Sequence, residues 1–476
     1  MKRVLAFDFG ASSGRAILAE YSDGALTYRE VHRFENRPRE TDGHFRWDFA
    51  DLMENVYKGI EKAGEFDSIG FDTWGVDFGL LDEGGRLLED PVHYRDGRTA
   101  GMLEQAEKIM PQAELYGATG SQIMAINTLF QLLALQQEQS ELLKQAKRLL
   151  FMPDLFAHAL CGSEVCETTI ASTSQMLDAK SGGWSKPVLE AFNIPEQLLA
   201  PLVPSGSVVG EYKGAKVIAV AGHDTQCAVA AMPDPQPGAA FLSCGTWSLI
   251  GCELDEPVLT EQSRELALSN ERGANGKVNY LKNIIGLWLI QESRRQWQRE
   301  GMDYSFAQLT QMALEAEPLQ SFIDPDAPEF TPPGDIPARV REFCRRTGQP
   351  VPETVGQVMC CVYQSLALKY RFALEQLSRS TGQSFTALHI MGGGAQAQLL
   401  CQMTANSIGL PVITGPIEAT ALGNILIQLV ALGELKNLDE GRALIARTEP
   451  VQRYQPEDTA LWNSAFERYK TILKES

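Results

Sequence analysis

The amino-acid sequence predicts an α/β protein built from two domains, and three observations lead to this prediction. The chain has 476 residues, which is more than one hydrophobic core usually serves. Short apolar segments typical of strands alternate with longer segments that have helical spacing. An apolar strand followed by a glycine-centred turn occurs near the start, around Gly10, and again half a chain later, around Gly245.

The first half opens with three predicted strands, at 3–10, 15–22 and 26–34, which are joined by the turn sequences ASSG and DGA. A helix is predicted over 47–64, because Leu52, Val56, Ile60 and Ala63 recur at helical spacing. Further predicted elements are a strand–turn–strand segment at 67–85 and helices at about 99–110, 127–146 and 154–161.

The second half repeats this organisation. Strand, glycine turn and strand are predicted at 238–254, and 281–292 is predicted to begin a helix that places Asn283 and Gln291 near one face. The later elements are a strand, glycine loop and helix at 387–409, a strand at 411–416 and a helix at 418–433. The segment PDPQPG, at 233–238, has the composition of a boundary, so the predicted domains are 1–232 and 238–476.

The two glycine turns have two interpretations. Any β-hairpin needs such a turn, so the similarity of the halves is expected for unrelated hairpins as well. The sharper interpretation is a duplicated α/β domain, with one phosphate-binding hairpin in each copy and a ligand cleft between the copies.

Composition and charge exclude several classes of function. The formal net charge is −19, with 44% apolar and 22% charged residues. This balance argues against nucleic acid and against an anionic membrane surface as main partners. No apolar run is long enough to span a membrane, and no signal sequence is recognisable. The nine cysteines form no C-x-x-C pair, which favours a reduced, cytoplasmic protein and disfavours a structural zinc site.

The sequence DFGASSGR, at 8–15, predicts an anion site. It lacks the spacing and the lysine of the common nucleotide loop. In a tight hairpin turn, however, the backbone N–H groups converge on one side, and Gly10 and Gly14 tolerate positive φ. Asp8 would repel a bare phosphate, so its presence predicts a Mg²⁺ ion between its carboxylate and the phosphates. The remaining donors are the hydroxyls of Ser12 and Ser13 and the guanidinium of Arg15.

The sequence VAGHDTQCAVA, at 220–230, contains a candidate general base. Asp224 follows an apolar strand and precedes a helix, with His223 and Thr225 on either side. Asp224 alone could simply cap that helix. Beside two phosphate loops, a carboxylate at a strand end is better explained as the group that accepts a proton from a substrate hydroxyl.

The sequence FDTWGVDF, at 71–78, predicts a binding surface for a polyhydroxylated ligand. Asp72 and Asp77 offer carboxylates that accept O–H bonds, and Trp74 offers an aromatic face for C–H groups. Gly75 allows a close approach to the backbone, whereas Phe78 is expected to be a core residue.

Three motifs of the chain resemble the phosphate and adenosine loops of the superfamily that includes actin, hexokinase and the heat-shock-protein ATPases. DFGASSGR is similar to its first phosphate loop, SCGTWS at 243–248 to the second, and MGGGAQ at 391–396 to the adenosine loop. The resemblance implies two RNase-H-like domains that flank a deep interdomain cleft, with ATP and Mg²⁺ as cofactors.

Within that superfamily, the chain resembles the FGGY carbohydrate kinases, and among them the subgroup that acts on L-rhamnulose. The most discriminating segments are DTWGVDF and NIIGLWLIQ, and the resemblance extends from about residue 4 to about 455. It implies nucleotide contacts, substrate contacts and one metal-associated residue. These are Ala11, Ser12, Ser13, Gly14, Arg15, Thr246, Gln291 and Gly393 for the nucleotide, Gly75, His223, Asp224, Thr225 and Asn283 for the sugar, and Asp8 for the metal.

The activity implied is ATP-dependent phosphorylation of L-rhamnulose at O1, with Asp224 as the base. Another ketose, such as L-fuculose or L-ribulose, is an alternative substrate. An actin-like or chaperone-type ATPase is an alternative of a different class, although it gives no reason for DTWGVDF near Asp224. The implied partners are a small ketose and Mg-ATP, and the oligomeric state stays open.

Overall fold

The computed structural model describes residues 1–475, which form two compact units. The first comprises Met1–Asp234, Glu253–Tyr280 and Glu418–Glu449, and the second comprises Pro235–Cys252, Leu281–Ile417 and the chain from Pro450 to the end of the described residues. The chain leaves the first unit within the predicted boundary segment. The assignment of all of 238–476 to one domain differs from the structure, because Glu253–Tyr280 and Glu418–Glu449 belong to the first unit.

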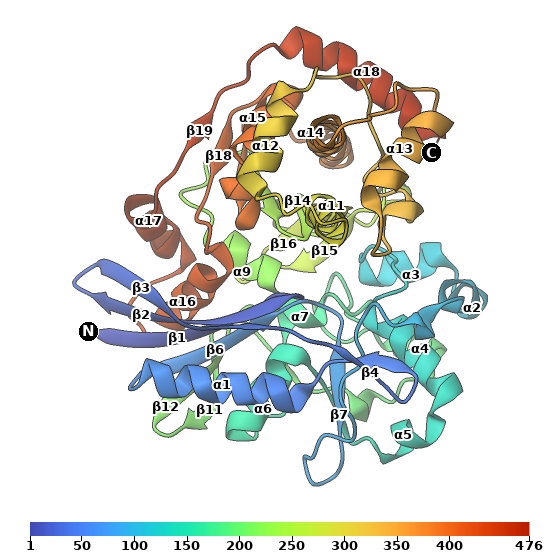
Figure 1. The fold of residues 1–476 in the computed structure, drawn as a ribbon. Helices are drawn as coiled ribbons and strands as arrows, with labels where there is room; N and C mark the ends of the chain where they lie inside the picture. Colours follow the sequence, from blue (N-terminus) through green and yellow to red (C-terminus); the bar gives the residue numbers. More distant parts are fainter. Residues whose placement is uncertain (476) are drawn as a thin grey trace. The chain divides into compact units, whose positions relative to one another are not determined.

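The first unit is built on a six-stranded sheet with the order β11-β12-β6-β1-β2-β3 (Figure 1). Strands β1, β6 and β12 run parallel, whereas the hairpins β1/β2, β2/β3 and β11/β12 are antiparallel. The carboxyl ends of the three parallel strands therefore meet at one edge. The strands are β1 (Lys2–Phe9), β2 (Ser13–Ser22), β3 (Ala25–Glu35), β6 (Ser68–Thr73), β11 (Ser207–Tyr212) and β12 (Ala215–Ala219).

Helices cover both faces of this sheet. Helices α1 (Phe49–Ala63) and α6 (Met152–Cys161) lie on one face and α16 (Ala419–Ala431) on the other (Figure 1). Two successive residues of β6 face the helices on opposite sides, since side chains alternate between the faces of a strand. Phe71 stacks on Phe156 of α6, with ring centroids 5.6 Å apart. A Cβ at Gly70 would meet Asn424 and Gln428 of α16, so this glycine lets α16 approach closely.

Polar bonds attach α16 to the first unit although it lies late in the sequence. Gln428 donates to the carbonyl of Leu5 at 3.1 Å, and Asn424 donates to that of Gly70 at 3.2 Å. Ser68 donates to Gln428 at 2.7 Å. These bonds to β1 and β6 explain why 418–449 joins the first unit rather than the second.

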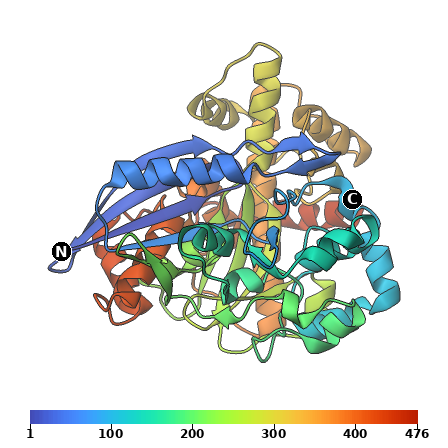
Figure 2. The same ribbon diagram turned by 90° about the horizontal axis from the view of Figure 1, so that it is seen from below.

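The remaining elements of the first unit surround the sheet, and Figure 2 shows from below how α1 packs along β1–β3. They are β4 (Arg39–Thr41), β5 (His44–Arg46), β7 (Phe78–Leu81), α2 (Met102–Ile109), α3 (Gln112–Thr119), α4 (Thr128–Glu138), α5 (Ser140–Gln145), β8 (Arg148–Phe151), β9 (Cys166–Glu167), α7 (Thr168–Ala171), α8 (Lys186–Ala191), β10 (Leu202–Val203), α9 (Asp224–Ala230), α10 (Glu261–Glu265), β15 (Ser269–Arg272) and α17 (Leu438–Thr448).

The second unit contains the strands β13, β17, β18 and β19 and most of β14 and β16, in the sheet order β16-β14-β13-β17-β18-β19. The predicted hairpin is present, because β13 pairs antiparallel with β14, and β13 pairs parallel with β17. Its elements are β13 (Ala239–Cys244), β14 (Trp247–Leu254), β16 (Val278–Ile285), α11 (Trp288–Arg299), α12 (Phe306–Glu315), α13 (Ile336–Arg346), α14 (Val355–Thr381), β17 (Ala387–Met391), α15 (Gln398–Ile408), β18 (Val412–Thr414), β19 (Arg453–Tyr454) and α18 (Thr459–Glu475).

Two further observations concern the length of the helices and the state of the cysteines. No helix within residues 1–475 is both long and apolar enough to cross a membrane. All nine cysteines are free thiols, and eight of them are buried.

Candidate active site

Three carboxylates gather where the parallel strands of the first unit end. Asp8 on β1 lies beside Asp72 on β6 in the strand register. The next residue of β6, Thr73, pairs with His223, which directly precedes Asp224 at the first position of α9. The strand order thus brings together three residues that are far apart in the sequence.

Asp224 is the most accessible of these carboxylates, with 32% of its side chain exposed. Its Oδ1 accepts from the N–H of Thr225 at 2.6 Å, so the residue also orders the start of its helix. Partial removal from water and the charge of Asp8 raise the pKa of Asp224, while His223 opposes this shift. A carboxylate with a raised pKa is a better proton acceptor at neutral pH than an ordinary one.

Asp72 is fully buried, and one of its carboxylate oxygens has no hydrogen-bond donor. Other carboxylates lie nearby. Asn424 donates to Oδ2 at 2.7 Å, whereas Oδ1 has no hydrogen-bond partner. Burial, together with the charges of Asp8 and Asp224, raises the pKa of Asp72 well above its ordinary range. Asn424 comes from α16, and no pattern in the sequence predicted its contact with Asp72.

The guanidinium of Arg15 supplies positive charge to this carboxylate cluster. It donates to Asp8 at 2.7 and 3.0 Å and also pairs with Glu418. Burial disfavours its charge, but Asp8 and Glu418 outweigh burial and raise the pKa of Arg15. The sequence predicted Arg15 as a phosphate ligand, and a phosphate would have to compete with these two carboxylates.

The cluster fits a divalent cation. Burial and the neighbouring carboxylates raise the pKa of Asp72 and of Asp224, and Asp72 has an orphaned buried oxygen, so a cation would relieve a surplus of negative charge. Within residues 1–475, no three His, Cys, Asp or Glu side chains are arranged to bind a metal by themselves. Mg²⁺ keeps several waters and binds through one or two carboxylates and substrate phosphates.

The turn between β1 and β2 is a hairpin, as predicted. Its glycines, however, serve a role other than the one expected from the sequence. The N–H of Gly10 donates to the carbonyl of Ser13 at 2.9 Å and closes the turn that contains Ala11 and Ser12. Neither Gly10 nor Gly14 has positive φ, so the turn does not use the conformational freedom that these glycines offer. Gly14 is required for space instead, because a Cβ there would lie 2.2 Å from the ring of Phe34.

The segment predicted to bind a polyhydroxylated ligand is more buried than expected. Asp77 is 1% exposed, and its carboxylate accepts from the indoles of Trp47 at 2.7 Å and Trp74 at 2.9 Å. The N–H of Tyr94 and the amide of Gln131 also donate to it, each at 3.2 Å. Asp77 is therefore not available to a ligand hydroxyl. It fixes two neighbouring indoles, whose ring centroids lie 4.0 Å apart.

Strained backbone follows Gly75, the glycine predicted to contact substrate. Val76 has a φ of +68°, which is rare for a β-branched residue. Hydrogen bonds on both sides hold this conformation, because its N–H donates to Thr173 at 3.1 Å while its carbonyl accepts from Thr128 at 2.7 Å. A Cβ at Gly75 would lie 3.1 Å from Thr173. Strain held by surrounding bonds is typical of binding sites.

The burial of Asp77 leads to a prediction about pH. Burial raises its pKa to about 6, although four hydrogen bonds oppose the shift. A carboxyl whose pKa is raised by folding contributes stability at low pH, and this contribution is lost as the pH rises through the folded pKa. Relative to Asp77→Asn, the wild-type protein should lose roughly 1.4 kcal/mol of unfolding free energy between pH 5 and pH 8. Urea titrations of both proteins at each pH test this, and parallel pH dependences would contradict it.

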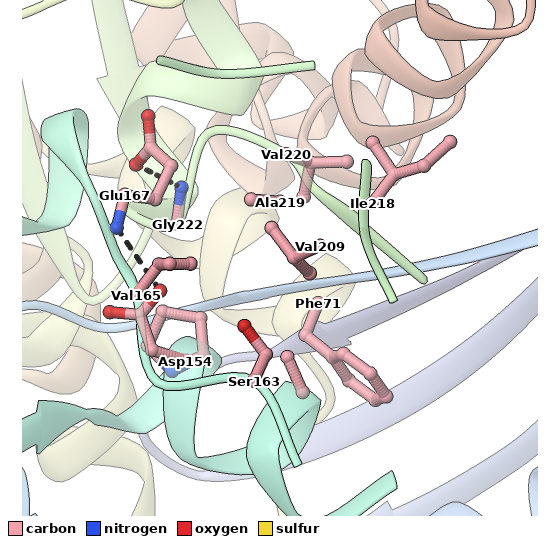
Figure 3. Close-up of a pocket in the computed structure, with 12 residues that line it drawn as sticks. Phe71, Asp154, Ser163, Val165, Glu167, Val209, Ile218, Ala219, Val220 and Gly222 are labelled. Atoms are coloured by element: carbon pink, nitrogen blue, oxygen red, sulfur yellow. Dashed lines mark hydrogen bonds between the residues drawn. The ribbon is translucent and has the colours of Figure 1, made fainter. Parts of the chain in front are cut away.

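The loop that carries His223 and Asp224 is anchored by Glu167, a residue that sequence reasoning missed. Its Oε2 accepts from the N–H groups of Gly222 at 2.9 Å and Thr169 at 2.8 Å. The N–H of Glu167 donates to Asp154 at 3.1 Å (Figure 3). Both carboxylates line a small cavity whose other walls are mostly apolar. The only signal in the sequence is an acidic residue before Thr168-Thr169, at a position that caps α7.

In the second unit, the second hairpin turn packs on the start of α11. The N–H of Gly245 donates to the carbonyl of Trp247, two residues on, at 2.8 Å, whereas Gly10 donates to the carbonyl three residues on. The carbonyl of Thr246 accepts from the N–H of Trp288 at 3.2 Å, and its hydroxyl lies 3.5 Å from Gln291 of α11. Thr246 and Gln291 are thus brought together in the second unit.

The prediction that Asn283 and Gln291 share a helical face is wrong. Asn283 lies on β16, whereas Gln291 lies on α11. The β-branched pair Ile284-Ile285 favours a strand, and Gly286 separates the two elements. A Cβ at Gly286 would lie 2.4 Å from the hydroxyl of Ser248, so the turn requires glycine.

The glycine loop after β17 presents backbone without side chains. Gly392 has a φ of +79°. Gly393 begins a short 3₁₀ turn, and a Cβ at Gly393 would meet no neighbouring atom within 4 Å. A Cβ at Gly394 would lie 2.2 Å from the sulfur of Cys244. The loop therefore rests on β13 on one side and is open at Gly393, which suits contact with a flat ligand.

Comparisons with known proteins agree with this architecture. Residues 3–239 match the N-terminal domain, and residues 240–432 the C-terminal domain, of the FGGY family of carbohydrate kinases. A rhamnulokinase of Bacteroides thetaiotaomicron is 42% identical over 483 residues, covering 98% of this chain and 99% of that protein. A rhamnulokinase of Bacillus subtilis is 39% identical, covering 98% of each chain.

Solved structures share the fold at lower identity. A ligand-bound xylulose kinase from Lactobacillus acidophilus superimposes with a TM-score of 0.81 at 17% identity, over 100% of this chain and 98% of that one. A Plasmodium falciparum glycerol kinase with ADP gives a TM-score of 0.76 at 15% identity, over 98% of each chain. With both family domains matched and relatives near 40% identity over almost the full length, this chain belongs to the FGGY family of carbohydrate kinases.

Proposed function

We propose that the protein transfers the γ-phosphoryl group of ATP to O1 of L-rhamnulose, which yields L-rhamnulose 1-phosphate and ADP. The substrate is inferred from the curated rhamnulokinases that are 38–42% identical to the chain. The observation that carries the reaction type is Asp224, a partly exposed carboxylate at the carboxyl end of the parallel strands, beside Asp8 and Asp72.

Asp224 is assigned the role of general base. It takes the proton from O1 of the sugar as that oxygen attacks the γ-phosphorus, and ADP leaves with the electron pair of the broken P–O bond. Such a base contributes about 10²- to 10⁴-fold in rate. His223, Thr225, Gly75 and Asn283 are assigned to the sugar, and the strained backbone at Val76 supports Gly75 as part of a binding surface.

The nucleotide is assigned to the two hairpin turns and the glycine loop. Residues Ala11 to Arg15 supply N–H groups and hydroxyls to the phosphates, and Thr246, Gln291 and Gly393 bind the rest of the nucleotide. Phosphoryl transfer depends mostly on positioning and charge stabilisation, which N–H groups in a fixed turn provide.

A Mg²⁺ ion is the cation that the carboxylate cluster is proposed to hold, through Asp8 and Asp72 and intervening waters. When bound, it would neutralise charge on the phosphates of ATP. Asp8 and Asp72 would then orient the coordinated waters, and Arg15 would hold Asp8 in place through its two hydrogen bonds. We also place the reaction in the cytoplasm, where ATP is available to such an enzyme.

The proposed function is tested by coupled ADP release with Mg-ATP and a panel of acceptors. The panel is L-rhamnulose, L-fuculose, L-ribulose, D-xylulose, D-fructose and glycerol. We expect the highest kcat/KM with L-rhamnulose. Preference for another ketose would keep the mechanism and replace the substrate. ADP release that is equal with and without every acceptor would overturn the kinase assignment in favour of an actin-like or chaperone-type ATPase.

A further inference from the structure

We propose that Glu271 is a positioning residue that acts on Asp224 through His223. The inference rests on the proposed function, because it concerns the sugar and the base of that reaction. Glu271 lies on β15, in the later segment that joins the first unit, and no sequence motif pointed to it.

The geometry forms a chain of three side chains. The Oε2 atom of Glu271 lies at ion-pair distance, 3.0 Å, from Nδ1 of His223, and Nε2 of the same ring lies 3.5 Å from Oδ1 of Asp224. The imidazole thus lies between two carboxylates and has one nitrogen facing each. Both His223 and Glu271 are nearly buried, with side chains 10% and 7% exposed, whereas Asp224 is accessible.

Glu271 is itself held in place by side chains of α9 and β16. Gln226 of α9 donates to the same Oε2 at 2.7 Å, and Asn279 of β16 donates to the side-chain carbonyl oxygen of Gln226. The helix that begins at Asp224 therefore also fixes the carboxylate that orients His223. A carboxylate locked in this way fixes the ring orientation of a histidine and the position of its protons.

The charges around the ring determine where its protons reside. Burial disfavours the imidazolium, but Glu271, Asp224 and Glu167 outweigh burial and raise the pKa of His223. Asp8 and Asp72 act on Asp224 from β1 and β6, and Arg15 faces Asp8 from β2. With Nδ1 facing Glu271 and Nε2 facing Asp224, a protonated His223 ring favours the ionised form of the base and fixes its direction.

Two variants separate positioning from simple structural support. Glu271→Gln keeps an oxygen that can accept from Gln226 and His223 while removing the charge, so folding should be retained. We expect kcat to fall by roughly 10- to 100-fold, as for other residues that orient a functional histidine. The KM for ATP should stay unchanged. The double variant Glu271→Gln/His223→Gln should be no slower than His223→Gln alone, because Glu271 acts only through the ring.

The matched control is Glu253→Gln, in the same unit. Glu253 pairs with Arg442 at 2.9 Å and is a comparable carboxylate outside the cluster. Its loss should leave kcat unchanged. A normal kcat in Glu271→Gln, or a loss that simply adds to that of His223→Gln, would overturn the proposal.

A readout independent of activity is the ¹⁵N spectrum of the imidazole nitrogens of His223, assigned by comparison with His223→Gln. Recorded across a range of pH, the spectra should show that the ring of His223 stays doubly protonated to a higher pH in the wild-type protein than in Glu271→Gln. Identical spectra would overturn the proposal. If the wild-type protein phosphorylates no acceptor, the proposed function fails, while the spectra still decide whether Glu271 sets the protonation of His223.

Discussion

Asp224→Asn is expected to bind ATP and the ketose almost normally and to lose about 10³-fold in kcat. The amide oxygen of Asn can still accept from the N–H of Thr225, which Asp224 accepts at 2.6 Å, so the start of α9 should be preserved. An amide cannot take the proton of the sugar hydroxyl, and a well-placed base contributes about 10²- to 10⁴-fold. Steady-state kinetics, with calorimetric titration of ADP and of L-rhamnulose, give the two quantities separately.

The control for this prediction is Asp82→Asn. Asp82 accepts from the N–H groups of Gly84 and Arg86 in an exposed turn, so the same change of carboxylate to amide there should leave kcat unaltered. If Asp224→Asn turned over within a few-fold of the wild-type protein, Asp224 would be a helix-capping residue and the base would have to be sought elsewhere. If it bound neither ligand, its loss of activity would say nothing about proton transfer, and Asp224→Glu would be measured next.

The hairpins and their turns could be predicted because turn chemistry is local. The strand β1, the turn through Gly10 and the strand β2 are encoded within a short stretch of chain, and the same holds around Gly245. The error at Asn283 has a local cause as well: helical spacing continues across Gly286, where a strand ends and a helix begins shortly afterwards. Periodicity alone does not distinguish a helix from a strand followed by a helix.

The parts of the site that escaped prediction depend on contacts between distant residues. Asn424 reaches Asp72 from 352 positions away, and Glu167 reaches Gly222 from 55 positions away. Asp77 was expected to face a ligand because the indole of Trp47, 30 positions earlier, could not be placed from the sequence. A single sequence carries no signal for such pairs, so it indicates the residue types of a site more readily than their partners.

Gly423→Ala is expected to destabilise the first unit by about 3 kcal/mol or more, although alanine is normally the better helix former. Gly423 lies in α16, where that helix packs against α9. A Cβ at this position would lie 1.8 Å from the carbonyl oxygen of Cys227 and 2.5 Å from its carbon, both backbone atoms of α9. A flexible side chain could move away, but a helix backbone can yield only if α9 shifts as a whole. Urea unfolding, monitored by circular dichroism, measures the loss.

The same shift would reach the proposed base, because α9 begins at Asp224, in the turn that precedes Cys227. We therefore expect the folded fraction of Gly423→Ala to show a reduced kcat in addition to its lower stability. Gly117→Ala is the matched control, since Gly117 lies in the exposed part of α3 and a Cβ there would have nothing within 4 Å. That substitution should stabilise by about 0.5–1 kcal/mol without affecting kcat. Equal stability changes in the two variants would mean that α16 and α9 are not in backbone contact and that α16 does not support the position of Asp224.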